Sequence, residues 1–381
     1  MITILKTRSH LLLAIALLLF FALMLIDPQS VLESGRKAIE LCLNIILPSL
    51  LPFFVISRII LNTGAIYTIS RIFKPIMNPL FNLPGSAAFP LMAGWLSGYP
   101  AGAKYTMDLY KKGLLSRDEA QRILPFCNNS GPLFIVGAVG TGYFGSPEIG
   151  VIMLACHLLA SITVGIGTAL FSRKKDYHPY DRKIDNMQKQ TEFTGRMLTD
   201  AIIDSTGVLM QISGTIIFFA VVVQTLETAG VFSFIEKILA LITGAYDLYS
   251  EVVKVLLSGS TEITYGLYLL SQVSGIPMHY KVLLASFLCG FGGFSVHTQV
   301  TGLCPPEFKM KKYVFGKLVH GTIASIYTGV FMISRTIPVM SLATGTHYPP
   351  RFSVFLYLPY IILLISGIVC ISRLRRRGKV L

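Results

Sequence analysis

Apolar runs close to the length of a membrane-spanning helix recur along this chain of 381 residues. The runs near that length are residues 11–26, 39–61, 149–171, 208–226, 313–333 and 352–371. A helix needs about 20 predominantly apolar residues to cross a bilayer. Hydrophobic residues make up 53% of the sequence and charged residues only 14%, whereas a soluble domain carries about 25% charged residues. The sequence therefore predicts an all-α polytopic membrane protein and excludes a water-soluble globule.

The basic residues lie between or beside the apolar runs. Lys and Arg number 33 against 19 Asp and Glu, for a net charge of +14. The clusters fall in residues 6–8, 173–196, 309–317 and 373–379. The positive-inside rule places all four, and so both termini, in the cytoplasm. A basic surplus is also typical of nucleic-acid-binding proteins, but this placement favours a multi-pass protein of the cell membrane that contacts the lipid bilayer and no nucleic acid.

Signals of catalysis or metal binding are weak. The six cysteines occur singly, without a Cys-x-x-Cys pair or clustered histidines, so neither a disulfide framework nor a zinc site is indicated. No Ser/His/Asp spacing or phosphate-binding loop occurs in the sequence. We therefore expect no enzymatic activity, no catalytic residue, no metal and no cofactor. An intramembrane hydrolase built on Glu262 and His297 is the remaining enzymatic alternative.

Four polar breaks interrupt apolar runs of about half the spanning length. They are residues 97–104, 127–132, 258–264 and 290–299. An unpaired backbone amide in hydrocarbon costs several kcal/mol, so such breaks persist only inside the protein or along a cavity. They predict broken helices and re-entrant hairpins around an interior site.

Two breaks precede the basic segment 173–196 and two follow it, which suggests an internal repeat of about 170 residues. With a cytoplasmic N-terminus, residues 39–61 cross inward and their counterparts 208–226 cross outward, so the two copies are expected to be inverted. The predicted organisation is an N-terminal span (1–38), a first repeat (39–171), a basic cytoplasmic linker (172–200), a second repeat (201–335) and a C-terminal span with a basic tail (336–381).

Three motifs carry a family resemblance. They are LPSLLPFF at residues 47–54, SGYPAGAK at 97–104 and FCNNSGPLF at 126–134. Together they resemble the YlbJ family of sporulation integral membrane proteins, part of the nucleoside-recognition or gate domain group, which is distantly similar to concentrative nucleoside transporters. The resemblance covers about residues 39–333. It implies a transport-like fold of two inverted gate-type repeats and a role in spore cortex formation.

The resemblance implies a protein that binds or moves a small polar solute, nucleoside-like or other. A coupling ion is a further candidate ligand. Another copy of the chain and other sporulation membrane proteins are candidate partners. The alternative function is a non-transporting membrane scaffold or partner subunit in spore envelope assembly.

The segment 259–262 resembles the transporter hairpin in which a Gln or Ser, a Thr or Ser and a Glu bind the nucleoside. We therefore expect Ser260, Thr261 and Glu262 to bind substrate. Ile263 follows where that family has Ala or Ser before Pro, which leaves the ligand class open. Glu262 lies between apolar segments, where a charge is costly unless paired, protonated or hydrated, or else lies near the membrane interface. Lys104 either extends toward the cytoplasm or neutralises Glu262.

Asn128, Asn129 and Ser130 lie at an expected unwound tip. Their amide and hydroxyl groups either bind an uncharged polar solute or cap the broken helix ends, and both interpretations remain open. The candidates with weaker support are Ser97, Tyr99, Ser295 and His297. A lone buried histidine is more often a satisfied core residue than a proton relay.

Overall fold

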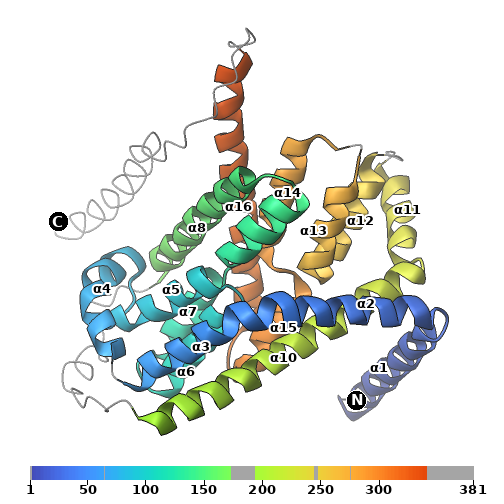
Figure 1. Ribbon diagram of the computed structural model, residues 1–381. Coiled ribbons are helices and arrows are strands. Elements are labelled where there is room, and N and C mark those ends of the chain that lie inside the picture. The colour runs from blue at the N-terminus through green and yellow to red at the C-terminus, as the bar shows by residue number, and fades with distance from the viewer. Residues whose placement is uncertain (1, 64, 173–193, 244–247, 275, 341–381) are drawn as a thin grey trace.

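The computed structural model describes residues 2–63, 65–172, 194–243, 248–274 and 276–340 (Figure 1). Within these ranges the protein is helical and contains no strand, so the all-α prediction is confirmed. The predicted C-terminal run 352–371, the basic tail and most of the linker 172–200 lie outside the described residues.

The part before the linker contains eight α-helices among the described residues, with two π-helical segments (η1, η3) and one 3₁₀ turn (η2). They are α1 (Ile2–Met24), α2 (Pro28–Leu41), η1 (Cys42–Ile46), α3 (Leu47–Asn62), α4 (Ala65–Phe81), η2 (Gly85–Ala87), α5 (Ala88–Ser97), α6 (Ala101–Lys111), α7 (Arg117–Cys127), η3 (Leu133–Tyr143) and α8 (Pro147–Leu170).

The part after the linker continues the same helical pattern. It contains α10 (Gly195–Thr228), α11 (Val231–Thr243), α12 (Leu248–Thr261), α13 (Ile263–Gln272), α14 (Met278–Phe291), α15 (Gly293–Leu303) and α16 (Met310–Met340).

Local sequence sets several helix starts. Ser116 and Glu119 form a reciprocal capping box at the start of α7. Ser146 accepts a hydrogen bond from the backbone of Ile149 at the start of α8, and Pro147 occupies the first helical position, where its missing N–H is not needed. These caps satisfy amides that the first helical turn leaves without partners.

Three described stretches are long and apolar enough to cross a membrane: Pro147–Leu170, Gly195–Thr228 and Met278–Leu303. Two bent pairs, Ala14–Met24 with Pro28–Asn44 and Leu50–Asn62 with Ala65–Phe81, raise the number to five if each pair is one span. The predicted runs 149–171 and 208–226 lie in α8 and α10.

The predicted run 39–61 differs from a single straight span. It comprises the end of α2, the η1 segment and most of α3. Residues Leu50–Asn62 are long and apolar enough to cross a membrane only together with α4, from which they are bent by 89°. The run 313–333 lies in α16, which is not among the three spanning candidates.

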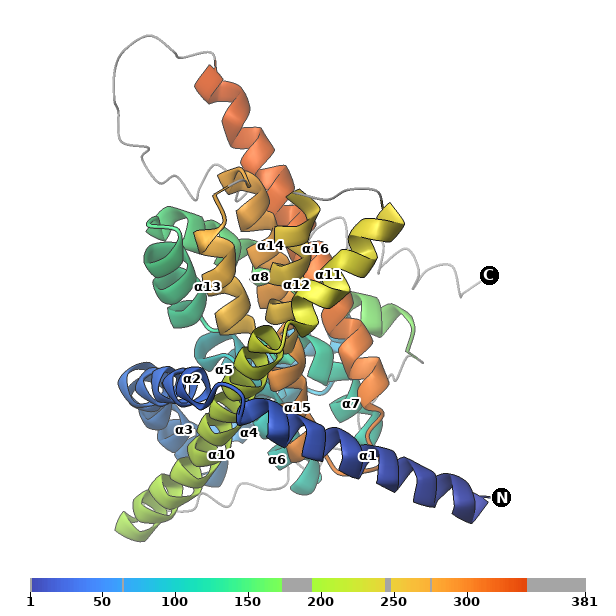
Figure 2. The same cartoon turned by 90° about the vertical axis from the view of Figure 1, so that its right-hand side faces the viewer.

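Helix α10 lies antiparallel to α2 and α3 (Figure 1). Near one end Gly35 of α2 approaches Val221 of α10, and near the other Arg58 of α3 pairs with Asp204 of α10. Helix α16 packs against α7, α8 and α14 in the middle of the body (Figures 1 and 2). It therefore connects the helices before the linker with those after it.

Two groups of buried apolar side chains form the core. The larger group includes Phe126 of α7, Leu209 of α10 and Val300 of α15. The smaller group joins η3 and α8 to helices α12 through α14. Many large apolar side chains also lie on the outside, such as Leu18 and Ile203. Exposed apolar surface of this kind is expected where a protein faces lipid rather than water.

Candidate functional site

The four polar breaks pack against each other in two pairs. In the first pair Gly98, between α5 and α6, lies so close to Gly131 that a Cβ on Gly98 would come within 2.6 Å of the Gly131 backbone nitrogen. In the second pair a Cβ on Gly293, at the start of α15, would lie 2.9 Å from the Gly259 backbone oxygen. Gly98 and Gly293 have φ angles of 84° and 74°. Both positions therefore require glycine for space and for backbone conformation.

Tyr99 joins the two pairs. Its hydroxyl donates a hydrogen bond to the backbone oxygen of Cys289, 2.6 Å away on α14. A Cβ on Gly292, in the α14–α15 break, would lie 3.0 Å from the same hydroxyl. Ser130 also donates to the Cys289 oxygen, over 3.1 Å. All four breaks therefore belong to one interior region.

Asn128 and Asn129 are fully buried between α7 and η3. The Nδ2 of Asn128 donates to the Tyr313 hydroxyl over 2.8 Å, and the Nδ2 of Asn129 donates to the Phe126 backbone oxygen over 2.8 Å. Among the described residues, neither Oδ1 atom accepts a hydrogen bond. The donor side of each amide thus has a partner, while the acceptor oxygen has none among the described residues.

Lys317 of α16 lies beside these asparagines and is fully buried. Its Nζ donates to the Asn128 backbone oxygen over 2.7 Å and lies 2.9 Å from His320 Nδ1. The Nζ also lies 5.3 Å from the centre of the Tyr99 ring, within cation–π range. In the part of the chain that the structure describes, no carboxylate forms an ion pair with Lys317. Lys317 is buried in the helical body, unlike Lys309, Lys311 and Lys312 of the same basic cluster, which are exposed.

Two buried histidines continue this network. The backbone N–H of Ser130 donates to His157 Nε2 over 3.2 Å, and His320 Nε2 lies 3.0 Å from the His157 backbone oxygen. The two imidazole rings lie 4.5 Å apart between their centres. Sequence reasoning missed Lys317, His157 and His320. All three left the same signal, an ionisable residue within an apolar run: His157 in 149–171, and Lys317 and His320 in 313–333.

His297 of α15 is buried at the edge of the same region. Its ring packs edge-on against Phe291 and Tyr313, with centroid distances of 4.7 and 5.4 Å. Neither ring nitrogen has a hydrogen-bond partner among the described residues, and the same holds for the Ser97 hydroxyl. Ser295 is buried on the same helix. The structure thus brings Ser97, Tyr99, Asn128, Asn129, Ser130 and His297 into one neighbourhood.

Glu262 lies in the second pair of breaks and is 4% exposed. Its Oε2 accepts a hydrogen bond from the Tyr265 backbone over 2.8 Å, so Glu262 is the N-cap of α13. No ion pair involving Glu262 occurs among the described residues. Thr261 donates to the Leu257 backbone oxygen over 2.9 Å, and Ser260 is half-buried beside Gly293. Glu262 therefore has a capping role in addition to any contact with a solute.

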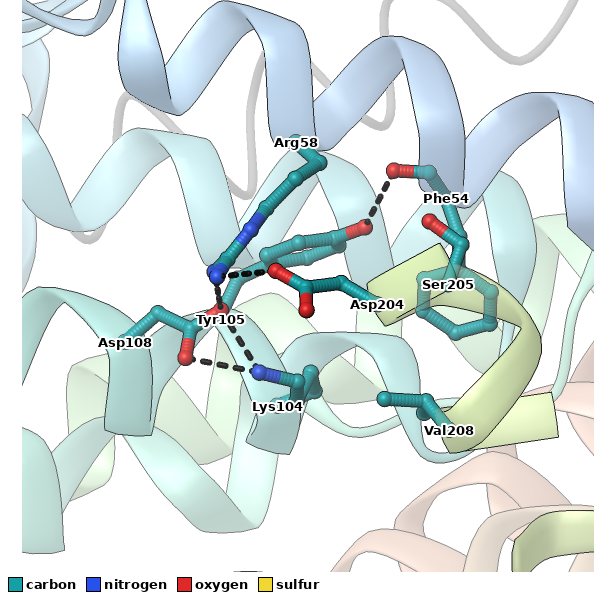
Figure 3. A pocket seen from close by; sticks show the side chains of 8 residues that line it. All are labelled: Phe54, Arg58, Lys104, Tyr105, Asp108, Asp204, Ser205 and Val208. Atoms are coloured by element: carbon teal, nitrogen blue, oxygen red, sulfur yellow. Dashed lines mark hydrogen bonds and ion pairs between the residues drawn. The ribbon is translucent and has the colours of Figure 1, made fainter. Parts of the chain in front are cut away.

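Lys104 belongs to a separate ionic cluster, so the alternative in which it neutralises Glu262 is wrong. Its Nζ lies 2.7 Å from Asp108, which also pairs with Arg58. Arg58 reaches Asp204 of α10 over 2.6 Å. Figure 3 shows these four side chains around a small pocket between α3, α6 and α10. The cluster ties the helix that follows the first break to α3 and α10.

No group of three or more His, Cys, Asp or Glu side chains in the described ranges is arranged to hold a metal ion. The cysteines at positions 42, 127, 156, 289 and 304 carry free thiols.

Residues 43–174 match the Gate family, described as nucleoside recognition, and this region contains the first two breaks. The chain is 31% identical over 368 residues to the sporulation integral membrane protein YlbJ of Bacillus subtilis (strain 168). That alignment covers 90% of this chain and 86% of the Bacillus protein. No solved structure matches the chain.

Proposed function

Because the chain belongs to the YlbJ family of sporulation integral membrane proteins, we propose that it binds a small polar solute between its broken helices and moves that solute across the membrane. One observation carries the proposal. Two buried amide oxygens, Oδ1 of Asn128 and of Asn129, have no partner among the described residues at the point where the breaks meet. Buried polar atoms are rarely left without a partner. The Gate match over residues 43–174 favours a nucleoside or a solute of similar polarity.

Two inverted gate-type repeats with re-entrant hairpins account for the paired breaks. Each repeat supplies one pair, residues 97–104 with 127–132 and residues 258–264 with 290–299. Paired broken helices of this kind allow a transporter to expose one site to either side of the membrane in turn. In a sporulating cell the solute movement would serve formation of the spore cortex.

The solute chemistry follows from the atoms at the site. The oxygens of Asn128 and Asn129 accept hydrogen bonds, whereas the Ser97 hydroxyl both donates and accepts. A solute with amide, amine or hydroxyl groups satisfies them. The aromatic rings of Phe291 and Tyr313 pack edge-on against the neighbouring His297, and rings of this kind suit a planar base.

Thermal unfolding of the purified full-length protein tests solute binding. The probes are uridine, adenosine and a set of other small polar solutes, including ribose and free amino acids. A bound solute at about 100 times its Kd stabilises the folded state by about 2.7 kcal/mol. Asn128→Ala and Asn129→Ala should abolish the stabilisation, whereas Asn62→Ala, at an asparagine that accepts from Lys112 near the surface, should preserve it.

The scaffold alternative gives the opposite pattern. It predicts no stabilisation by any probe, together with normal sporulation in strains that carry Asn128→Ala at normal membrane levels. That combination would refute solute movement as the function.

We further propose that both termini and the linker are cytoplasmic, on the basis of the basic clusters. Asp185 and Gly378 mark the linker and the C-terminal tail, and both lie outside the described residues. Single cysteines at these positions, in a chain whose six native cysteines are replaced, should resist impermeant thiol reagents in intact cells. Labelling at Asp185 would contradict the inverted arrangement.

A further inference from the structure

Lys317 and His320 form a hydrogen-bonded pair whose direction can be assigned. A carbonyl oxygen only accepts, so His320 Nε2, 3.0 Å from the His157 oxygen, carries a proton and donates it there. In the neutral ring, Nδ1 then has a free lone pair, and Lys317 donates to it over 2.9 Å. The pair is fully buried in the middle of the helical body.

Both charge states of Lys317 fit these surroundings. The ammonium has three N–H groups, which face the Asn128 oxygen, His320 Nδ1 and the Tyr99 ring. The neutral amine has two N–H groups and keeps the first two hydrogen bonds. One proton can therefore bind or leave without an exchange of partners.

Among the described residues, no negatively charged side chain pairs with Lys317 to stabilise its protonated form. The titratable side chains around it are His320 and Tyr313 of α16, His157 of α8, Tyr99 and Cys127 of the first pair of breaks, Cys289 of α14 and His297 of α15. None of these is a carboxylic acid. A buried charge without a counter-ion is costly, so a change in the local environment is enough to shift the balance between the two states.

The pair also contacts the candidate solute site directly. Lys317 holds the backbone oxygen of Asn128, and the Oδ1 of the same residue lacks a partner among the described residues. Two residues further on, the Ser130 N–H donates to His157 Nε2, which a second proton on that imidazole would prevent. A proton at the Lys317–His320 pair or at His157 and a solute at Asn128 would therefore both change the hydrogen bonds of residues 128–130.

We propose that Lys317 and His320 form a proton-binding site that is linked to solute binding at Asn128. A proton taken from water on one side of the membrane forms an N–H bond at Lys317 Nζ, and it returns to water on the other side when that bond breaks. The linkage rests on the proposed function, whereas proton binding by the pair does not.

Proton binding is measured on the purified full-length protein with lysine labelled by carbon-13 at Cε, whose resonance shifts when the amine loses its proton. An exposed lysine keeps its proton below about pH 9. We expect one lysine resonance to titrate between about pH 6 and pH 9 and to be absent from Lys317→Met. His320→Gln should move that titration, since Gln cannot share the proton.

Lys281→Met is the matched control, because Lys281 is also buried but its Nζ donates to the Ser271 backbone oxygen. The titrating resonance should persist in this variant. If no lysine titrates below about pH 9, or if the titrating signal survives in Lys317→Met, the proton site is refuted. Size-exclusion chromatography of each variant verifies folding.

The linkage is tested with uridine as the probe. The thermal stabilisation by uridine should differ between about pH 6 and pH 9 in the wild type and in Lys281→Met, but not in Lys317→Met. An equal pH dependence with and without Lys317 would refute the linkage. If uridine and the other solutes fail to stabilise the wild type, the proposed function fails, while the lysine titration still decides the proton site.

Discussion

The phenol of Tyr99 donates a hydrogen bond to the backbone oxygen of Cys289, 2.6 Å away, and thereby ties the break between α5 and α6 to the end of α14. Ser130, from the second break, donates to the same oxygen over 3.1 Å. A single carbonyl of the second half of the chain thus holds both breaks of the first half. Any movement that separates the two pairs of breaks must release these hydrogen bonds.

Tyr99→Phe removes one of the two donors and keeps the ring beneath Lys317. A typical intramolecular hydrogen bond contributes about 1 kcal/mol, and the Cys289 oxygen keeps Ser130 as a partner, so we expect unfolding to become easier by about 0.5–1.5 kcal/mol. Thermal unfolding in detergent measures the change. Tyr280→Phe, at an exposed tyrosine of α14, is the control and should have no effect. Equal losses in both variants would contradict the role of the Tyr99 hydroxyl.

Gly94 allows α5 to pack against the backbone of the second break. A Cβ on Gly94 would overlap the Cys127 backbone oxygen. Because the clashing atom belongs to the backbone, no side-chain rotation can relieve the overlap. Gly94→Ala should therefore destabilise the protein by about 1–3 kcal/mol, as overpacked sites do. Gly167→Ala, on α8, is the control because nothing lies within 4 Å of the added methyl group.

The control should be neutral or stabilising, by up to about 1 kcal/mol, since alanine favours helix more than glycine does. Protein yield and thermal unfolding separate the two glycines. If Gly94→Ala were as stable as Gly167→Ala, the close approach of α5 to the second break would be wrong.

The breaks themselves were predictable because they are local features of the sequence. Gly, Pro, Ser and Asn interrupt apolar runs, and unpaired amides exclude such stretches from lipid. In the structure they lie together in one buried region, while the solute site expected there stays a prediction. The capping role of Glu262 could also have been anticipated, since a carboxylate that directly precedes an apolar helical run suits an N-cap.

Contacts between distant segments were not predictable in this way. Lys317 follows Lys311 and Lys312 closely in sequence, and only the packing of α16 against α7 and α8 reveals that it is buried beside Asn128. Lys104 is a different case, because its partner Asp108 lies one turn along the same helix and the spacing alone indicates that pair. A single sequence records charges and periodicity but not which helix faces are brought together.

The ionic cluster in Figure 3 predicts a difference between its two aspartates. The Asp108 side chain is 8% exposed and pairs with both Lys104 and Arg58, whereas the Asp204 side chain is 51% exposed and pairs with Arg58. Asp108→Asn should cost about 2 kcal/mol or more, because it leaves a partly buried cation without its partner. Asp204→Asn should cost less than about 1 kcal/mol, as exposed pairs usually do.

Thermal unfolding at low and high salt checks this prediction. The loss in Asp204→Asn should shrink as salt rises, since exposed charges are screened, while the loss in Asp108→Asn should largely remain. Equal losses for the two variants at low salt would contradict the cluster as described.

Glu262 allows its capping role and a solute or proton role to be separated. Glu262→Gln keeps an oxygen that accepts from the Tyr265 N–H, so the cap of α13 should survive. The variant also removes a buried charge that has no ion-pair partner among the described residues, so stability should stay the same or rise slightly. Glu262→Ala removes the cap and should cost about 0.5–2 kcal/mol.

Solute binding and sporulation of the Glu262 variants then distinguish a capping role from a solute-binding or proton-binding role. If Glu262 binds the solute or a coupling proton, Glu262→Gln should lose stabilisation by solute and should fail to support sporulation despite a normal amount of protein in the membrane. If Glu262 serves only as a cap, Glu262→Gln should behave like the wild type and only Glu262→Ala should be impaired, in proportion to its lost stability. A fully functional Glu262→Gln strain would therefore remove Glu262 from the solute site and leave that site to Asn128, Asn129 and Ser130, whose side chains do not depend on the α13 cap.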